Sequence, residues 1–239
     1  GPRGAGGSAR AGTQGGGGKV VRSGANAVPH LSVGGSTDAE VDRLVEHYEG
    51  LGIRRILCLR GDRPADGNQR TVFAKDLVEQ LHQRFPGQFE LSVAAYPEIH
   101  PDSASAEEDI RYFAAKVHAG ASSAITQYFY STDAYGYFIE RCAKAGVNIP
   151  IHVGVMPITN LDALQRFSAK AGADIPRWLS KSMAGYADDE QGLVSFGVEV
   201  VTSLCEKLLQ MGAPGLHFYT LNRWGASSQI CRNLGFPEH

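Results

Sequence analysis

Polar and aromatic side chains recur at or after the ends of the apolar segments in this sequence. They comprise imidazoles, guanidinium groups, carboxylates, a tyrosine and amides, a set suited to holding a polar or anionic small molecule. The positions are His30, Arg60-Gly61-Asp62, the run Tyr96 to His100, Gln127, the run Pro157 to Asn160, and Asn222-Arg223. One polar residue after a strand is usually a solvated loop residue. Six such positions together favour a shared ligand site, because parallel strands bind ligands at their carboxyl ends.

A predicted helix over residues 106–119 has two distinct faces. An apolar stripe at helical spacing predicts the face that packs against the core, and it consists of Ile110, Phe113, Ala114 and Val117. A second face carries Asp109, Tyr112 and Lys116. Spacing alone favours a solvated face with a charge pair over a binding function.

The elements that must position these residues alternate between apolar runs and helical periodicity. The predicted strands are 27–33, 55–59, 91–96, 123–129, 149–156 and 216–221, and the predicted helices are 38–51, 71–84, 106–119, 132–145, 161–171 and 193–211. This alternation predicts an α/β fold with a parallel sheet. A polar excursion is expected over 180–191. Residues 1–26, which are rich in glycine, are expected to be a linker or remnant, and residues 27–239 a single domain.

Composition and motifs argue against several classes of protein. A net charge of −2 gives no electrostatic case for nucleic acid or an anionic membrane surface, and no apolar run approaches membrane-spanning length. The four cysteines lack zinc-ligand or C-x-x-C spacing, which favours buried thiols and a cytoplasmic protein. No dinucleotide fingerprint, phosphate loop or metal motif is present. A cell-adhesion role for Arg60-Gly61-Asp62 would need an exposed, secreted loop.

Longer motifs then give the chain a family resemblance. From His30 to Phe236 it resembles bacterial-type methylenetetrahydrofolate reductase, in the family's motif order and spacing. The motifs are Pro29-His30-Leu31, Leu59-Arg60-Gly61-Asp62, Ala94 to Pro101, Ala124 to Phe129, Gly154 to Asn160 and His217 to Arg223. The resemblance implies a (β/α)8 TIM barrel that binds FAD and uses NADH or NADPH to reduce 5,10-methylenetetrahydrofolate. It also implies a homo-oligomer.

The resemblance assigns roles residue by residue. The residues implied to bind FAD are His30, Arg60, Gly61, Asp62, Ala74, Tyr96, His100, Asp109, Tyr112 and Lys116. Those implied to bind substrate are Asp62, Gln127, Phe167 and Arg223. Asp62 is the implied catalytic residue, a carboxylate able to stabilise a cationic iminium form of the folate.

Some features depart from the family pattern. Tyr112 stands for a common Asn, Ala115 for an Arg that contacts FAD phosphate, and Ala163 for a Gln near the substrate. We do not find the family's opening strand with its general-acid Glu, so we expect about six of the eight βα units and an N-terminally truncated barrel. We also do not find the C-terminal regulatory domain of the eukaryotic enzymes, so we expect no control by S-adenosylmethionine. Two hypotheses stay open, the reductase itself and a non-catalytic FAD-binding fragment. Motif order argues against proline dehydrogenase, another flavin barrel.

Overall fold

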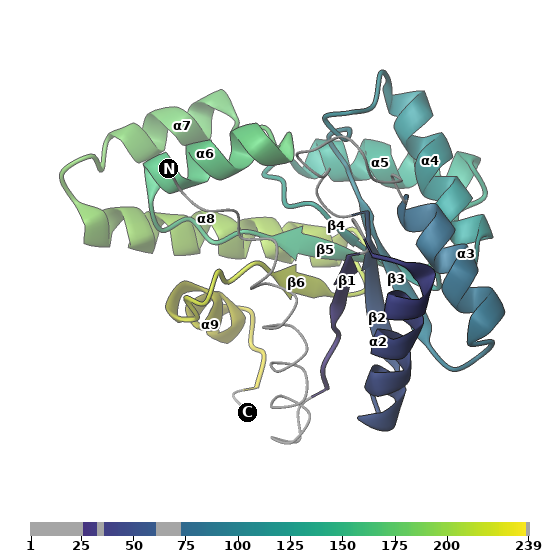
Figure 1. Ribbon diagram of the computed structural model, residues 1–239. Helices are drawn as coiled ribbons and strands as arrows, with labels where there is room; N and C mark the ends of the chain where they lie inside the picture. Colours follow the sequence, from purple (N-terminus) through teal and green to yellow (C-terminus); the bar gives the residue numbers. More distant parts are fainter. Residues whose placement is uncertain (1–25, 33–35, 61–72, 238–239) are drawn as a thin grey trace, which may run out of the picture. The chain divides into compact units, whose positions relative to one another are not determined.

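Strands and helices alternate along the chain in the computed structural model, which describes residues 26–32, 36–60 and 73–237 (Figure 1). The elements are β1 (His30–Ser32), α2 (Asp38–Gly50), β2 (Arg55–Leu59), α3 (Ala74–Arg84), β3 (Glu90–Ala95), α4 (Ala106–His118), β4 (Ser123–Thr126), α5 (Thr132–Lys144), β5 (Ile151–Val155), α6 (Leu161–Ala171), α7 (Arg177–Ala184), α8 (Glu190–Gln210), β6 (Leu216–Phe218) and α9 (Gly225–Asn233). They form two compact units.

The first unit contains the described residues up to Ala94 together with residues 115–123. Its strands are parallel neighbours, with His30 of β1 opposite Leu57 of β2 and Arg55 of β2 opposite Glu90 of β3. The helix α2 begins at a capping box, in which Thr37 and Glu40 satisfy each other's backbone N–H groups.

The second unit contains residues 95–114 and 124–239. Here β4, β5 and β6 are parallel neighbours, with Ala124 opposite Ile151 and Val153 opposite Leu216. Helices α6 to α9 share one hydrophobic core with β5, and the largest contribution comes from α8, which has 21 residues. The core includes Leu164, Leu179, Met183, Val201, Leu208 and Ile230.

Within each unit the strand order follows the chain order. A doubly wound sheet instead reverses its order at a switch point, where its ligand binds. Parallel strands that follow chain order, each with a helix after it, confirm the predicted α/β class and give a TIM-barrel-like fold.

The predicted elements agree with the structure except at a few ends. The strand predicted over 123–129 ends at Thr126, although Tyr128 and Phe129 stay buried. Apolarity marks burial and does not by itself mark strand pairing. The polar excursion predicted over 180–191 is wrong in part, because α7 occupies residues 177–184 and buries Leu179 and Met183 on one face. The short helix α9 was also not predicted.

All four cysteines lie within the described ranges and are free thiols, and those of Cys58, Cys142 and Cys205 are buried. Burial raises the pKa of each of these three thiols to about 12, so they are protonated and unreactive at neutral pH. No helix in the described ranges is both long enough and apolar enough to cross a membrane.

Two helical glycines give opposite predictions for alanine substitution. A Cβ at Gly197 of α8 would lie 2.3 Å from the Ile158 carbonyl oxygen, whereas one at Gly136 of α5 would meet only the Met211 side chain, at 3.5 Å. Gly197→Ala should therefore lower the free energy of unfolding by about 1–3 kcal/mol. The control Gly136→Ala should raise it by up to about 1 kcal/mol. Urea denaturation measures both, and equal effects would contradict the close approach of α8 to Ile158.

Candidate functional site

The second unit contains a cavity of about 440 Å³ at the carboxyl ends of β5 and β6. This volume lies in the range of small-molecule sites. The lining comes from the β5–α6 loop, one face of α6 and the segment after β6, and consists of Met156, Pro157, Thr159, Asn160, Ala163, Leu164, Arg166, Phe167, Tyr219, Thr220, Leu221 and Arg223.

Two residues predicted to bind substrate lie on this lining, Phe167 from α6 and Arg223 from the segment after β6. The Phe167 side chain is 42% exposed, so an aromatic face is available to a ligand. Arg166 adds a second guanidinium group. Flat rings next to cations suit an aromatic ligand that carries a negative charge.

Two other predicted positions have local structural roles. Asn160 caps α6, because its Oδ1 accepts the Ala163 backbone N–H at 2.8 Å. Gln127 is not part of the lining, and its Oε1 accepts the Tyr128 backbone N–H at 3.0 Å. The cap fixes the start of the helix that carries Phe167.

Tyr219 forms a wall of the cavity that sequence reasoning did not identify. Its hydroxyl donates to the Thr126 carbonyl oxygen at 2.9 Å. Its ring lies so close to β5 that a Cβ at Gly154 would be 2.8 Å from Tyr219 Cε2 and 2.1 Å from the Thr126 oxygen. Glycine at position 154 therefore makes room for this ring.

Two buried tyrosines just after β4 attach further walls of the cavity. The Tyr128 hydroxyl lies 3.0 Å from Ser168 Oγ on α6, and the Tyr130 hydroxyl donates to the Met156 carbonyl oxygen at 3.1 Å. Burial raises the pKa of the Tyr128 and Tyr130 hydroxyls above the usual value. Burial also raises the pKa of Tyr219, to about 12. All three hydroxyls therefore stay protonated and can donate hydrogen bonds at neutral pH.

The loop between β3 and α4 carries two residues predicted to bind FAD. The Tyr96 and His100 rings pack edge to face, with their centroids 4.5 Å apart. His100 Nδ1 accepts the Asp102 backbone N–H at 3.0 Å. In the neutral imidazole this leaves the proton on Nε2, as a donor.

The polar side chains of α4 make hydrogen bonds within the protein. Asp109 is 9% exposed and accepts a hydrogen bond from Ser103 Oγ at 2.8 Å. The Tyr112 side chain is 54% exposed, and its hydroxyl donates to Glu108 at 3.2 Å. Lys116 Nζ donates to the Ala94 carbonyl oxygen at 2.5 Å.

The first unit holds the other predicted residues. His30 is the first residue of β1, Arg60 follows the carboxyl end of β2, and Ala74 begins α3. Partial burial lowers the pKa of His30, which keeps its ring neutral at physiological pH. Gly61 and Asp62, the predicted catalytic residue, lie outside the described residues.

Glu98 has a raised pKa that its residue type alone does not reveal. Burial raises the pKa of its carboxyl to about 7, against a hydrogen bond from the Asp174 backbone N–H, at 2.9 Å, that lowers it. The motif from Tyr96 to His100 contains Glu98, but burial comes from the packing of segments distant in sequence.

Among the described residues, no group of three or more His, Cys, Asp or Glu side chains could hold a metal ion.

The raised pKa of Glu98 predicts a pH-dependent stability. A carboxyl whose pKa is higher in the folded state stabilises the fold below its unfolded pKa, near 4.5, and loses that contribution as the pH rises through about 7. From pH 5 to 8, the free energy of unfolding of the wild type should fall relative to Glu98→Gln by about 1–3 kcal/mol. Glu140→Gln, at an exposed carboxyl with a lowered pKa, should show no comparable change over this range. Parallel pH curves for Glu98→Gln and the wild type, from urea denaturation, would contradict the burial of Glu98.

The bond between Tyr128 and Ser168 predicts non-additive substitutions. Both side chains are buried, so Tyr128→Phe or Ser168→Ala alone leaves one hydroxyl without its partner and should cost about 1–3 kcal/mol. The double variant should cost less than the sum of the two, because no buried hydroxyl remains. Urea denaturation of all four proteins completes the cycle, and a strictly additive result would contradict the bond.

The chain is similar to known proteins over most of its length. The family model for methylenetetrahydrofolate reductase matches residues 3–235. The chain is 36% identical to 5,10-methylenetetrahydrofolate reductase of Escherichia coli (strain K12), over 90% of this chain and 72% of that protein. It is 33% identical to methylenetetrahydrofolate reductase (NADH) 1 of Arabidopsis thaliana, over 87% of this chain and 38% of that protein.

One solved structure has a related fold. It is an uncharacterized protein from Clostridium thermocellum that binds two copies of 5-methyl-5,6,7,8-tetrahydrofolic acid, with a TM-score of 0.55 and 19% identity, covering 86% of this chain and 71% of that one. At this identity the likeness bears on fold alone. Since the family model spans nearly the whole sequence and the relatives are more than 30% identical, this chain belongs to the methylenetetrahydrofolate reductase family.

Proposed function

We propose that this chain catalyses the FAD-dependent reduction of 5,10-methylenetetrahydrofolate to 5-methyltetrahydrofolate, with a reduced nicotinamide as the hydride donor. Family membership supports the reduction of methylenetetrahydrofolate. The observation that carries the proposal is that Phe167 and Arg223, 56 positions apart in sequence (223 − 167), line the same cavity.

We assign the cavity to the folate. Phe167 offers a face on which a pterin, an aminobenzoate or a nicotinamide ring can stack. Arg223 supplies a planar cation for a substrate carboxylate, and Tyr219, held by its bond to Thr126, closes one wall. We further propose that Gln127 hydrogen-bonds the pterin or the nicotinamide amide through its NH₂ group, since its Oε1 accepts the Tyr128 N–H.

The residue types assigned to the flavin suit a dinucleotide ligand. Arg60 and Lys116 carry the positive charges that a pyrophosphate requires. The neutral His30 and the Nε2 of His100 suit polar ring edges, with Tyr96 packed against His100. We propose that these residues, with Gly61, Asp62, Ala74, Asp109 and Tyr112, hold FAD. A bound flavin supplies the hydride chemistry that no side chain can.

The remaining site residues have an electrostatic or a structural role. We propose that the Asp62 carboxylate stabilises the positive charge of the iminium form of the folate, on which hydride transfer depends. The protonated hydroxyls of Tyr128, Tyr130 and Tyr219 are engaged by Ser168, Met156 and Thr126, so they hold the cavity in shape and do not supply protons.

Buried free thiols suit a reducing compartment, and we propose a cytoplasmic location.

Two assays on the purified chain with added FAD test the proposal. One follows oxidation of the reduced nicotinamide by menadione, and the other follows formation of 5-methyltetrahydrofolate. Arg223→Gln should raise the KM for the folate by about tenfold or more, because a charge-assisted hydrogen bond is lost. Lys144→Gln removes an exposed cation of α5 that pairs with Glu140, and serves as the control with wild-type kinetics.

The outcomes separate the two hypotheses. Folate reduction that depends on Arg223 supports the reductase. Flavin reduction without any folate reduction supports a flavin-binding fragment. Absence of both reactions in protein that has bound FAD rejects the proposed function.

A further inference from the structure

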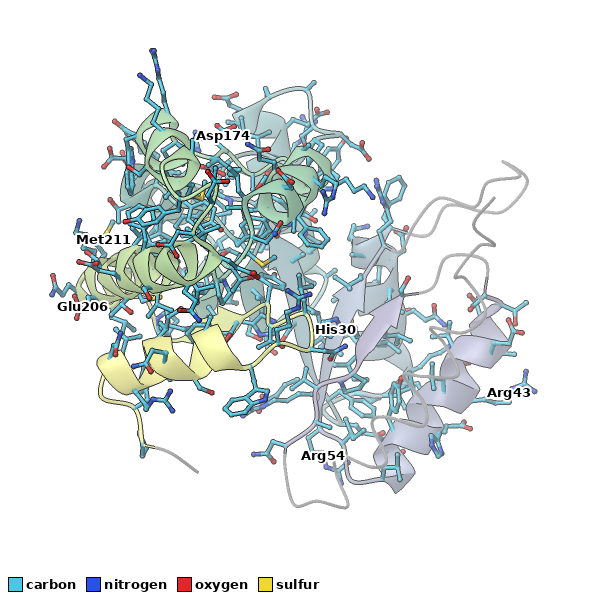
Figure 2. All side chains as sticks on the ribbon, turned by 90° about the vertical axis from the view of Figure 1, so that its left-hand side faces the viewer. His30, Arg43, Arg54, Asp174, Glu206 and Met211 are labelled. Carbon is cyan, nitrogen blue, oxygen red and sulfur yellow. The ribbon has the colours of Figure 1, made fainter. Side chains whose placement is uncertain are left out.

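Two loops of the second unit are fastened together. The first, residues 96–105, connects β3 to α4 and carries Tyr96 and His100. The second, residues 172–176, connects α6 to α7 and includes Asp174, in the green part of the ribbon (Figure 2). Glu98 Oε2 accepts the Asp174 backbone N–H at 2.9 Å, across 76 positions of sequence.

The same two loops also touch through a glycine. Gly172 ends α6 in the left-handed conformation, with φ of 67°. A Cβ at this position would lie 2.6 Å from Pro101 Cγ, so no larger residue fits without movement. The hydrogen bond at Glu98 is therefore accompanied by a second, closely packed contact between the same two loops.

The backbone between Glu98 and His100 is strained. Ile99 has φ of 71°, a conformation that is a genuine outlier for a β-branched residue. Such strain costs about 1–3 kcal/mol and persists only where the surroundings hold it in place. The Glu98–Asp174 bond and the Gly172 contact supply those surroundings directly before and after Ile99.

We propose that Glu98 is a positioning residue, which accepts the Asp174 N–H and so holds the Tyr96–His100 ring pair in a fixed relation to helix α6. The proposal rests on the proposed function, because the ring pair is assigned to the flavin and α6 carries Phe167. Glu98 does not line the cavity, and the proposal assigns it no hydride or proton transfer. Its effect reaches the reaction through the two loops.

Four variants isolate the bond from both ends. Glu98→Ala removes the acceptor, while Glu98→Gln keeps an oxygen at the same place. Asp174→Pro removes the N–H donor, while Asp174→Asn keeps it and removes only the exposed charge. The first member of each pair should weaken FAD binding by about 3–10-fold, the effect of one hydrogen bond. The second should stay within about twofold of the wild type.

A second measurement works without any ligand. Hydrogen exchange, followed by mass spectrometry, should speed up in residues 96–105 and 172–176 of Glu98→Ala and Asp174→Pro, with α8 unchanged as an internal reference. Exchange in these loops should be no faster in the double variant Glu98→Ala/Asp174→Pro than in either single variant, because both substitutions remove the same bond. Unchanged exchange in α8 excludes general unfolding as the cause.

The outcomes are distinguishable from those of the proposed function. If the wild type binds no FAD, the proposed flavin site fails and the positioning role fails with it, while faster loop exchange still confirms the bond. If FAD binds, wild-type affinity and exchange in Glu98→Ala overturn the proposal. An effect of Glu98→Gln equal to that of Glu98→Ala also overturns it, because an oxygen acceptor should suffice.

Discussion

The cavity depends on the rule that a buried polar group must find a partner. Three tyrosines near the ends of β4 and β6, the buried Tyr128 and Tyr130 and the partly buried Tyr219, pack against the core, and each must satisfy its hydroxyl there. Each hydroxyl meets a different part of the cavity frame: Ser168 on α6, the Met156 carbonyl of the β5–α6 loop, and the Thr126 carbonyl of β4. Hydrophobic packing holds these segments together but does not fix their exact relative positions. The three hydrogen bonds fix those positions, because each joins one particular pair of atoms.

A similar constraint operates at the opposite end of α6. The helix starts at the Asn160 cap and ends at Gly172, which packs on Pro101 next to the bond between Glu98 and Asp174. The helix that presents Phe167 is therefore fixed at both ends and at Ser168 in its middle. A stacking face gains affinity when it is ordered before the ligand arrives, because less conformational entropy is lost on binding. Under the proposed function, polar bonds outside the cavity would therefore affect ligand binding inside it.

The sequence predicts the alternation of elements well because a buried parallel strand is a short apolar run, as in residues 55–59, and because α6 is strongly periodic. The family resemblance also assigns both Phe167 and Arg223 to the substrate, and both line the cavity. It does not predict the partner of Tyr128, since Ser168 lies 40 positions away and has no distinctive type. Nor does it predict the burial of Glu98 or the eight-residue helix α7, whose only strong signal is Leu179 and Met183 one turn apart.

The central claim is that one ligand contacts the walls that these bonds hold together. Hydrogen exchange with and without 5-methyltetrahydrofolate tests it most directly. The account predicts slower exchange on ligand addition in the β5–α6 loop, in α6 and in residues 219–223 together, with α3 and the outer turns of α8 unaffected. Protection of only one of these segments, or protection confined to other parts of the chain, would contradict it.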